Sequence, residues 1–345
     1  MGRQARDLTA YIVYLDFLLT VVGAFAIYST NFIAYSESSP VFGTVYGVVI
    51  ALRGLLPLFL HDERLFRLLP FVHLPFLFLV VTLSLALNDV DVYLAGISIS
   101  ALLGIYTGSY VYSLEVSWSK RLNDPSRFFS LVSGSEALAF FIAPLLTYIT
   151  PDRTAFLLVL AVLVALGLTF LLYFARNVQE VEPKFFSGDF ALLKSSYPLL
   201  VLASLNWCLQ YLWMGTAFEL GVRQGIPGSL VSLAVEAETA LYMAIQFAMS
   251  RRGFGRFVNL RAVAVIIAAY ALVVATFTSL LFVRANFLTF LSLLLAIAVV
   301  SSPLEPLINA LASRERAQEV STLVVSFDFL GGGLGYVLSS LLLRA

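Results

Sequence analysis

The chain has 345 residues, of which 60% are hydrophobic and 12% are charged, and its 21 basic and 21 acidic residues cancel. This composition excludes a soluble globular enzyme and a nucleic-acid-binding protein, which need a polar or basic surface. Apolar segments of roughly 20 residues follow one another from end to end, and about 20 helical residues cross a hydrocarbon core about 30 Å thick. The sequence therefore predicts an all-α polytopic membrane protein.

Eleven apolar spans are predicted in chain order, and the first is a retained helix because no cleavage site follows it. The longest polar interruption runs from Ala175 to Ser196 and separates six spans from five. It predicts an N-terminal half (1–176), a cytoplasmic linker (177–195) and a C-terminal half (196–345). The spans lie near residues 10–35, 41–60, 67–87, 92–115, 128–149, 154–175, 196–222, 228–249, 258–282, 286–311 and 319–343.

The basic residues predict the orientation, since Lys and Arg concentrate on the cytoplasmic side of membrane proteins. With the N-terminus inside, sixteen of them fall in cytoplasmic segments, and Arg153, Arg223, Arg284 and Arg344 fall on the opposite side. This asymmetry alternates loop by loop. It predicts a multi-pass protein of the cell membrane with its N-terminus in the cytoplasm and its C-terminus outside.

Weak internal repeats relate the two halves, as in many transporter folds. HDERLFRLL, from His61, matches SRRGFGRFV, from Ser250, as a short basic turn between the second and third helix of its half. Further along, Glu115 falls on Glu305 and Glu136 falls on Asp328 at nearly the same offset. The pattern indicates a pseudo-two-fold arrangement.

These features resemble the major facilitator superfamily of secondary transporters, which are built as two six-helix halves. The loop after helix 2 in that family reads G-x-L-x-D-R-x-G-R-R, and Glu63-Arg64-Leu65-Phe66-Arg67 and Gly255-Arg256 are degenerate versions of it. Ala143-Pro144 and the run from Gly331 to Gly335 resemble its small-residue motifs in helices 5 and 11. The sequence departs from the family in ending with the eleventh helix. The resemblance implies a secondary transporter that works by alternating access and has no enzymatic activity, and we expect a monomer.

The resemblance also implies a cytoplasmic latch, formed by acidic and basic residues that hold the inner gate. Glu115 is expected to approach Arg121 or Arg127, and Glu305 to approach Arg314 or Arg316. The predicted gate residues are Glu63, Arg64, Arg67, Glu115, Arg121, Arg256, Glu305 and Arg314.

Five acids but one base lie well inside the spans, where a charge costs roughly 2.5–3.5 kcal/mol and usually marks a functional site. The acids are Asp16, Glu136, Glu236, Glu238 and Asp328, and the base is Arg53. Asp16 and Arg53 lie at similar depth, about 9–10 Å from the cytoplasmic ends of adjacent helices. We expect an ion pair between them, and Asp328 is a second expected partner of Arg53.

The other acids are candidates for proton coupling. In the resembled fold, helix 5 packs against helix 8, so Glu136 is predicted to face Glu236 or Glu238. Clustered carboxylates in a low dielectric disfavour one another's ionisation, so at least one should hold a proton near neutral pH. Asp16 is included among the proton-coupling candidates. The alternative for each acid is a permanently protonated carboxyl that is hydrogen-bonded between helices.

Polar side chains on helices 1, 4 and 7 predict the substrate path, since the resemblance implies that these helices line the central cavity. They are Asn31, Ser109, Tyr110, Asn206, Trp207, Gln210 and Tyr211. Such a pocket suits a small organic solute, and the acid surplus favours a cationic or neutral one. The alternative is that the aromatic residues are interfacial and that the serine packs helices closely.

Other functions have weaker support in the sequence. A membrane-embedded prenyltransferase would need paired acidic metal motifs, and Asn88-Asp89-Val90-Asp91 is unrepeated. Cys208 has no disulfide partner, and His61 and His73 lack companion ligands, so no metal or cofactor is predicted. The expected partners are the lipid bilayer, a solute and a proton or cation. A non-transporting receptor or an inactive remnant remains the alternative.

Overall fold

The computed structural model describes residues 3–34, 40–87, 90–150, 153–177, 181–253, 257–315 and 318–344. Within them, side chains are left undescribed at 3–7, 27–34, 40–46, 90–94, 147–149 and 176–177. The helices are α1 (Arg3–Ala34), α2 (Pro40–Phe59), α3 (Glu63–Leu87), α4 (Val90–Ser119), α5 (Pro125–Ile149), α6 (Arg153–Asn177), α7 (Phe190–Arg223), α8 (Gly228–Arg252), α9 (Leu260–Thr278), α10 (Phe287–Ser301), α11 (Leu304–Arg314) and α12 (Val320–Arg344), with a short 3₁₀ turn, η1 (Ser279–Leu281), after α9.

Each of the eleven predicted spans is met by a helix in the described part of the chain. Nine stretches are long and apolar enough to cross a membrane, and Gly47–Phe59 of α2 is a shorter apolar helix. The 34-residue α7 fills the remaining span. The prediction of an all-α polytopic membrane protein with about eleven crossings is therefore confirmed.

One of these crossings is broken in its middle. α10 ends at Ser301 and α11 begins at Leu304, although the two together form one apolar stretch, Phe287–Arg314. Pro303 lacks a backbone N–H, so it cannot continue the ladder of hydrogen bonds. The fully buried side chain of Gln246 in α8 donates to the Ser302 carbonyl at 2.7 Å. A backbone group that the break exposes is thereby satisfied at membrane depth.

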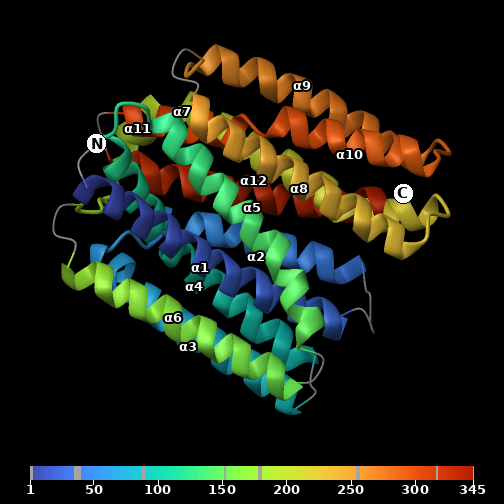
Figure 1. Cartoon of the computed structure of the whole chain (residues 1–345), viewed down its shortest axis with the longest axis horizontal. Coiled ribbons are helices and arrows are strands. Elements are labelled where there is room, and N and C mark those ends of the chain that lie inside the picture. Colours follow the sequence, from blue (N-terminus) through green and yellow to red (C-terminus); the bar gives the residue numbers. More distant parts are fainter. Residues whose placement is uncertain are drawn as a thin grey trace.

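The helices form two groups, which we name the N-terminal half (α1–α6) and the C-terminal half (α7–α12). Figure 1 shows the first group, in blue to green, below the second, in yellow to red. Between the halves, α2 packs against α12 and α5 packs against α8. The packing of α5 against α8 is the pairing that the sequence resemblance implied for the fifth span with the eighth.

Two glycine positions bring α12 very close to its neighbours. A Cβ atom on Gly331 would overlap the backbone carbonyl of Ser204 in α7. A Cβ atom on Gly333 would lie 2.5 Å from the Gly47 carbonyl oxygen and 2.7 Å from the Ala51 Cβ, both in α2. Small residues let helix backbones approach closely where lipid offers no hydrophobic driving force. The glycine run therefore packs on α7 of its own half at Gly331 and on α2 of the other half at Gly333.

The segment predicted as a linker packs on the N-terminal half in its described part. Phe185 and Phe186 are buried, and the Phe185 ring stacks on Phe66 with centroids 4.6 Å apart. The Ser113 hydroxyl donates to the Lys184 carbonyl at 2.8 Å and accepts from the Lys184 N–H at 2.9 Å. This segment therefore covers one end of the N-terminal half, and we call that end of the molecule the linker end.

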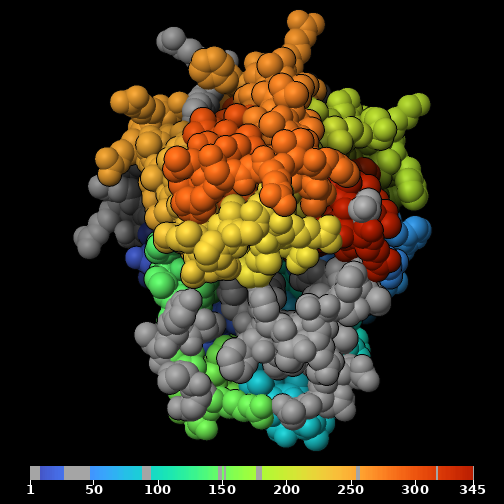
Figure 2. All heavy atoms as spheres, turned by 90° about the vertical axis from the view of Figure 1, so that its right-hand side faces the viewer, coloured from blue at the N-terminus to red at the C-terminus, as the bar shows by residue number. Residues whose placement is uncertain are grey.

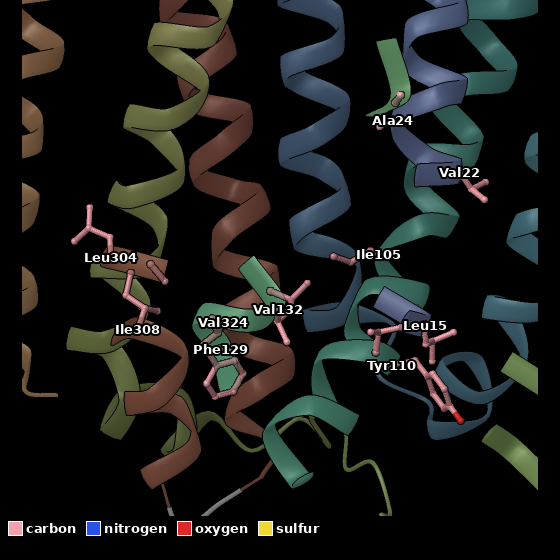
Figure 3. Close-up of a cluster of buried hydrophobic side chains, with 14 of the residues drawn as sticks. Leu15, Val22, Ala24, Ile105, Tyr110, Phe129, Val132, Leu304, Ile308 and Val324 are labelled. Carbon is pink, nitrogen blue, oxygen red and sulfur yellow. The ribbon is translucent and has the colours of Figure 1, made fainter. Parts of the chain in front are cut away.

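Figure 2 looks onto the opposite end of the molecule, where the described parts of the C-terminal half lie above those of the N-terminal half. At the linker end an apolar layer joins the halves. Figure 3 shows Phe129 and Val132 of α5 and Val324 of α12 in this layer, and all three belong to one buried cluster that includes Leu304 and Ile308 of α11. The core thus runs across the boundary between the halves.

Candidate functional site

A cavity of about 330 Å³ lies between the two halves. Its wall is mostly apolar, but ionisable side chains from seven helices also line it. The N-terminal half contributes Asp16, Arg53, His73, Glu115 and Glu136, and the C-terminal half contributes Glu305 and Asp328. Five carboxyl groups therefore share this space with one guanidinium and one imidazole.

Two of the carboxyl groups have oxygen atoms that lack partners among the described residues. Asp16 is 8% exposed and Glu115 is 3% exposed. Oδ2 of Asp16 and Oε1 of Glu115 are buried and accept no hydrogen bond from the described residues. An unsatisfied buried acceptor is costly, so both atoms mark places where a donor from another molecule would be favourable.

The acids of the cavity are close enough for their charges to interact. Glu136 interacts with Asp16, Glu305 and Asp328, so its neighbours come from both halves. Glu115 interacts with Glu136 and Glu305. Because like charges repel strongly in a medium of low dielectric, these five groups form one electrostatic unit.

Arg53 makes a contact between the halves. Its guanidinium lies over the ring of Phe329 in α12, 3.7 Å from the ring centroid, in a cation–π contact. The ion pairs of Arg53 with Asp16 and with Asp328 stay predictions.

His73 is a member of the cavity that the sequence analysis did not include among the site residues. It lies inside α3, and its Nδ1 is 3.1 Å from the Thr107 hydroxyl of α4. Gly104 makes room for it, since a Cβ there would lie 3.1 Å from the His73 ring and 3.2 Å from Arg53 Nη2. A histidine in the middle of an apolar span was the signal that could have revealed it.

Glu236 and Glu238 are not residues of the cavity, so the prediction that Glu136 faces them is wrong in this structure. Glu238 is 4% exposed and accepts from the Thr239 hydroxyl at 3.3 Å, and its charge reaches Tyr270 in α9, inside the C-terminal half. The α8 residue that reaches the acid cluster is Tyr242, whose hydroxyl donates to Glu305 Oε2 at 3.2 Å.

The two acids of the predicted latch, Glu115 and Glu305, line the cavity. Arg314 donates to the Val258 carbonyl at 2.8 Å, and Arg316 lies outside the described residues. The latch between these acids and the arginines of the linker end stays a prediction.

Hydrogen bonds of other residues close the linker end. The Tyr112 hydroxyl donates to Asn309 Oδ1 at 2.6 Å, deep between α4 and α11. Nearer the surface, Lys120 Nζ donates to the Glu315 carbonyl at 2.7 Å, and Arg127 Nη2 donates to the Arg252 carbonyl at 3.1 Å. Burial lowers the pKa of Lys120, although Glu319 and Glu315 oppose this effect. All three contacts join the two halves.

The other described gate residues, Glu63, Arg64, Arg67 and Arg121, lie on the surface of the linker end. Arg67 pairs with Glu63 at 2.6 Å and with Glu182 of the linker segment at 3.8 Å. The backbone N–H of Arg64 donates to Asp62, and Arg121 follows α4 in the turn to α5. Arg256 lies outside the described residues.

Of the predicted substrate residues, Trp207 and Tyr211 line the cavity. Gln210 turns away and accepts from the Tyr270 hydroxyl at 2.9 Å. Ser109, Tyr110 and Asn206 are buried but are not part of the cavity wall, and the side chain of Asn31 lies outside the described residues. Trp207 also contacts Phe329, with centroids 5.8 Å apart, so an aromatic wall continues from α7 to the ring beneath Arg53.

Comparison with known proteins gave matches among solved structures alone, since no protein-family model and no curated protein matches the sequence. The human organic anion transporter MFSD10 (TETRAN) aligns over 99% of this chain and 93% of its own, with 16% identity and a TM-score of 0.70. A bacterial homologue of the iron transporter ferroportin, in an outward-facing state, covers 98% and 91%, with 12% identity and a TM-score of 0.69. The fucose:proton symporter of E. coli covers 99% and 97%, with 13% identity and a TM-score of 0.65.

These similarities establish the fold. At such low identity they leave the solute and the coupling ion open. The chain has the fold of the major facilitator superfamily, as the sequence resemblance implied.

Proposed function

We propose that this protein is a secondary active transporter, not an enzyme, and that it moves a small organic solute by alternating access with proton coupling. The observation that supports this best is the cavity between the halves, which carries carboxyl groups from both of them and is closed at the linker end. A solute held there contacts both halves at once. Its binding can therefore bias the way in which they rock against each other.

Glu136 is the residue that we propose couples solute movement to protons. Its carboxyl lies in α5 at the boundary between the halves. It interacts electrostatically with Asp16 of its own half and with Glu305 and Asp328 of the other half. When the halves rock, the distances to the acids of the other half change, and so does the affinity of Glu136 for a proton. A fucose:proton symporter with the same fold shows that such a scaffold accommodates proton coupling.

The test uses the full chain in proteoliposomes with an imposed proton gradient and a panel of radiolabelled metabolites. The parent protein should accumulate one class of solute, and Glu136→Gln should abolish accumulation but retain solute exchange. The matched control is Glu219→Gln, which removes an exposed carboxylate that pairs with Arg223 on α7. Accumulation by Glu136→Gln at the parent's rate would refute the coupling role.

A non-transporting receptor is the alternative function. It would bind a solute in the same cavity but move none of it into liposomes, even with gradients of protons or sodium. The three polar contacts that close the linker end favour transport, because a receptor has no need of a gate that opens.

A further inference from the structure

We propose that the solute is an aliphatic amine that carries two or more positive charges and bridges the carboxyl groups of Asp16 in α1 and Glu115 in α4. This inference rests on the proposed transport function, since it names the solute of the same cavity. It goes further in specifying the charge, the number of charged groups and their separation.

The charge of the solute follows from the groups that line the cavity. Five carboxyl groups face one guanidinium and one imidazole there, and Arg53 is engaged with the Phe329 ring. An anionic solute would have to enter against this surplus of acids, whereas a cation would reduce the repulsion among them. The bound solute is therefore a cation.

The unpartnered oxygen atoms show what kind of cation is needed. Asp16 and Glu115 are both more than nine-tenths buried, yet Oδ2 of Asp16 and Oε1 of Glu115 accept no hydrogen bond among the described residues. A protonated amine brings three N–H donors, and charge-assisted hydrogen bonds to carboxylates are among the strongest that proteins make. A quaternary ammonium group, which has no N–H, would leave both oxygen atoms unsatisfied.

The spacing of the acids favours an extended cation over a metal ion. No group of three or more His, Cys, Asp or Glu side chains among the described residues could hold a metal ion. The carboxyl groups nevertheless come from α1, α4 and α5 on one side and from α11 and α12 on the other. A chain with an amino group at each end can reach acids that are too far apart to bind one ion together.

The apolar part of the wall suits the hydrocarbon between the amino groups. Most of the cavity surface is apolar, with Leu77, Ile97 and Val111 on the N-terminal side. Trp207, Tyr211 and Phe329 form the aromatic wall of the C-terminal side, where Phe329 already accepts one cation on its face. Methylene groups gain from this burial, and an amino group beside the rings gains from a cation–π contact.

The test measures binding to the full-length protein in detergent by calorimetry. The probes are 1,4-diaminobutane and 1,6-diaminohexane, with the monoamines and dicarboxylates of the same chain lengths and Mn²⁺ as comparisons. The second amino group should tighten binding by about tenfold or more relative to the matched monoamine, as expected for one added charge-assisted hydrogen bond. Dicarboxylates and Mn²⁺ should not bind competitively.

Two conservative variants locate the amino groups. Asp16→Asn and Glu115→Gln should each reduce diamine affinity toward that of the monoamine, while Glu219→Gln should leave both unchanged. Melting temperatures without ligand show whether each variant is folded, and a folded Asp16→Asn that binds diamines like the parent refutes the assignment. Equal affinity for monoamines and diamines, or tighter binding of a dicarboxylate or of Mn²⁺, overturns the proposal.

Transport assays separate this inference from the proposed function. If diamines bind as expected but no solute enters proteoliposomes, the transport proposal fails and the binding site stands. If another solute is accumulated and diamines neither bind nor compete with it, the transport proposal stands. The proposal that the solute is an aliphatic amine with two or more charges is then wrong.

Discussion

Replacing Gly333 by alanine tests the close contact between α2 and α12, which holds the two halves together. The added Cβ would lie 2.5 Å from the Gly47 carbonyl oxygen and 2.7 Å from the Ala51 Cβ. Both atoms belong to or adjoin the α2 backbone, so no side chain can rotate away. The whole of α2 must shift relative to α12.

The expected size of the effect combines two opposing terms. Alanine is favoured over glycine in a helix by about 1 kcal/mol. Forcing an extra methyl group into a packed contact costs about 1–3 kcal/mol, and a contact with rigid backbone lies at the upper end of that range. Gly333→Ala should therefore lower the free energy of unfolding by about 2 kcal/mol.

The chain offers a matched control in Gly23 of α1, because a Cβ there would meet nothing within 4 Å. Gly23→Ala should be stabilising by up to about 1 kcal/mol. Gly332→Ala should fall between the two, since the three atoms nearest to its Cβ all belong to the Tyr211 ring, the nearest at 2.7 Å, and a side chain can shift more easily than a backbone. Thermal unfolding of the three variants in the same detergent provides the ranking. A Gly333→Ala variant that melts at or above Gly23→Ala would refute the steric reasoning.

Two further predictions concern the C-terminal half and the orientation. Tyr270→Phe removes a buried hydroxyl that accepts from Trp213 Nε1 and donates to Gln210 Oε1, both at 2.9 Å. In a denaturant or thermal assay it should lower the free energy of unfolding by about 1–3 kcal/mol. The control is Tyr197→Phe, which removes an exposed hydroxyl and should leave stability unchanged. A stable Tyr270→Phe would mean that water replaces the hydroxyl. In a Cys208→Ala background, a membrane-impermeant maleimide should label Val283→Cys in intact cells and Asp62→Cys after permeabilisation alone, and the reverse pattern would invert the proposed topology.

The helices could be predicted from the sequence for a physical reason, whereas the packing of the fifth span against the eighth was implied by the family resemblance. A span must be long and apolar enough to cross the bilayer and must satisfy its own backbone, so the eleven runs were visible without knowledge of packing. The break between α10 and α11 at Ser302 and Pro303 could not be predicted from the apolar pattern of the sequence. The apolar run continues through it, and the buried Gln246 that satisfies the Ser302 carbonyl lies 56 residues earlier in the sequence.

The site was harder to predict because depth in the membrane does not fix direction. Each residue turns a helix by about 100°, so an error of one or two positions decides whether an acid faces the cavity or its own half. Asp16, Glu136 and Asp328 were found as intramembrane acids, and the cavity unites them. Glu238 has a similar sequence signature, but it faces Tyr270 in the C-terminal half.

The two halves meet at the α2–α12 contact and at the closure of the linker end, and different groups form these two contacts. At Gly47 and Gly333 the α2–α12 contact is made by backbone atoms, so a change in it requires one helix to shift as a whole. The closure at the linker end includes three polar contacts, of Tyr112, Lys120 and Arg127, and two of them go to backbone carbonyls.

At about 1 kcal/mol each, these three hydrogen bonds contribute a few kcal/mol to keeping the linker end closed. Inverting a two-state equilibrium from 1:99 to 99:1 requires a differential binding free energy of about 5.5 kcal/mol. A solute that gains two charge-assisted hydrogen bonds in one state alone supplies about 3–6 kcal/mol. The polar closure is therefore of the size that a ligand in the acidic cavity can overcome.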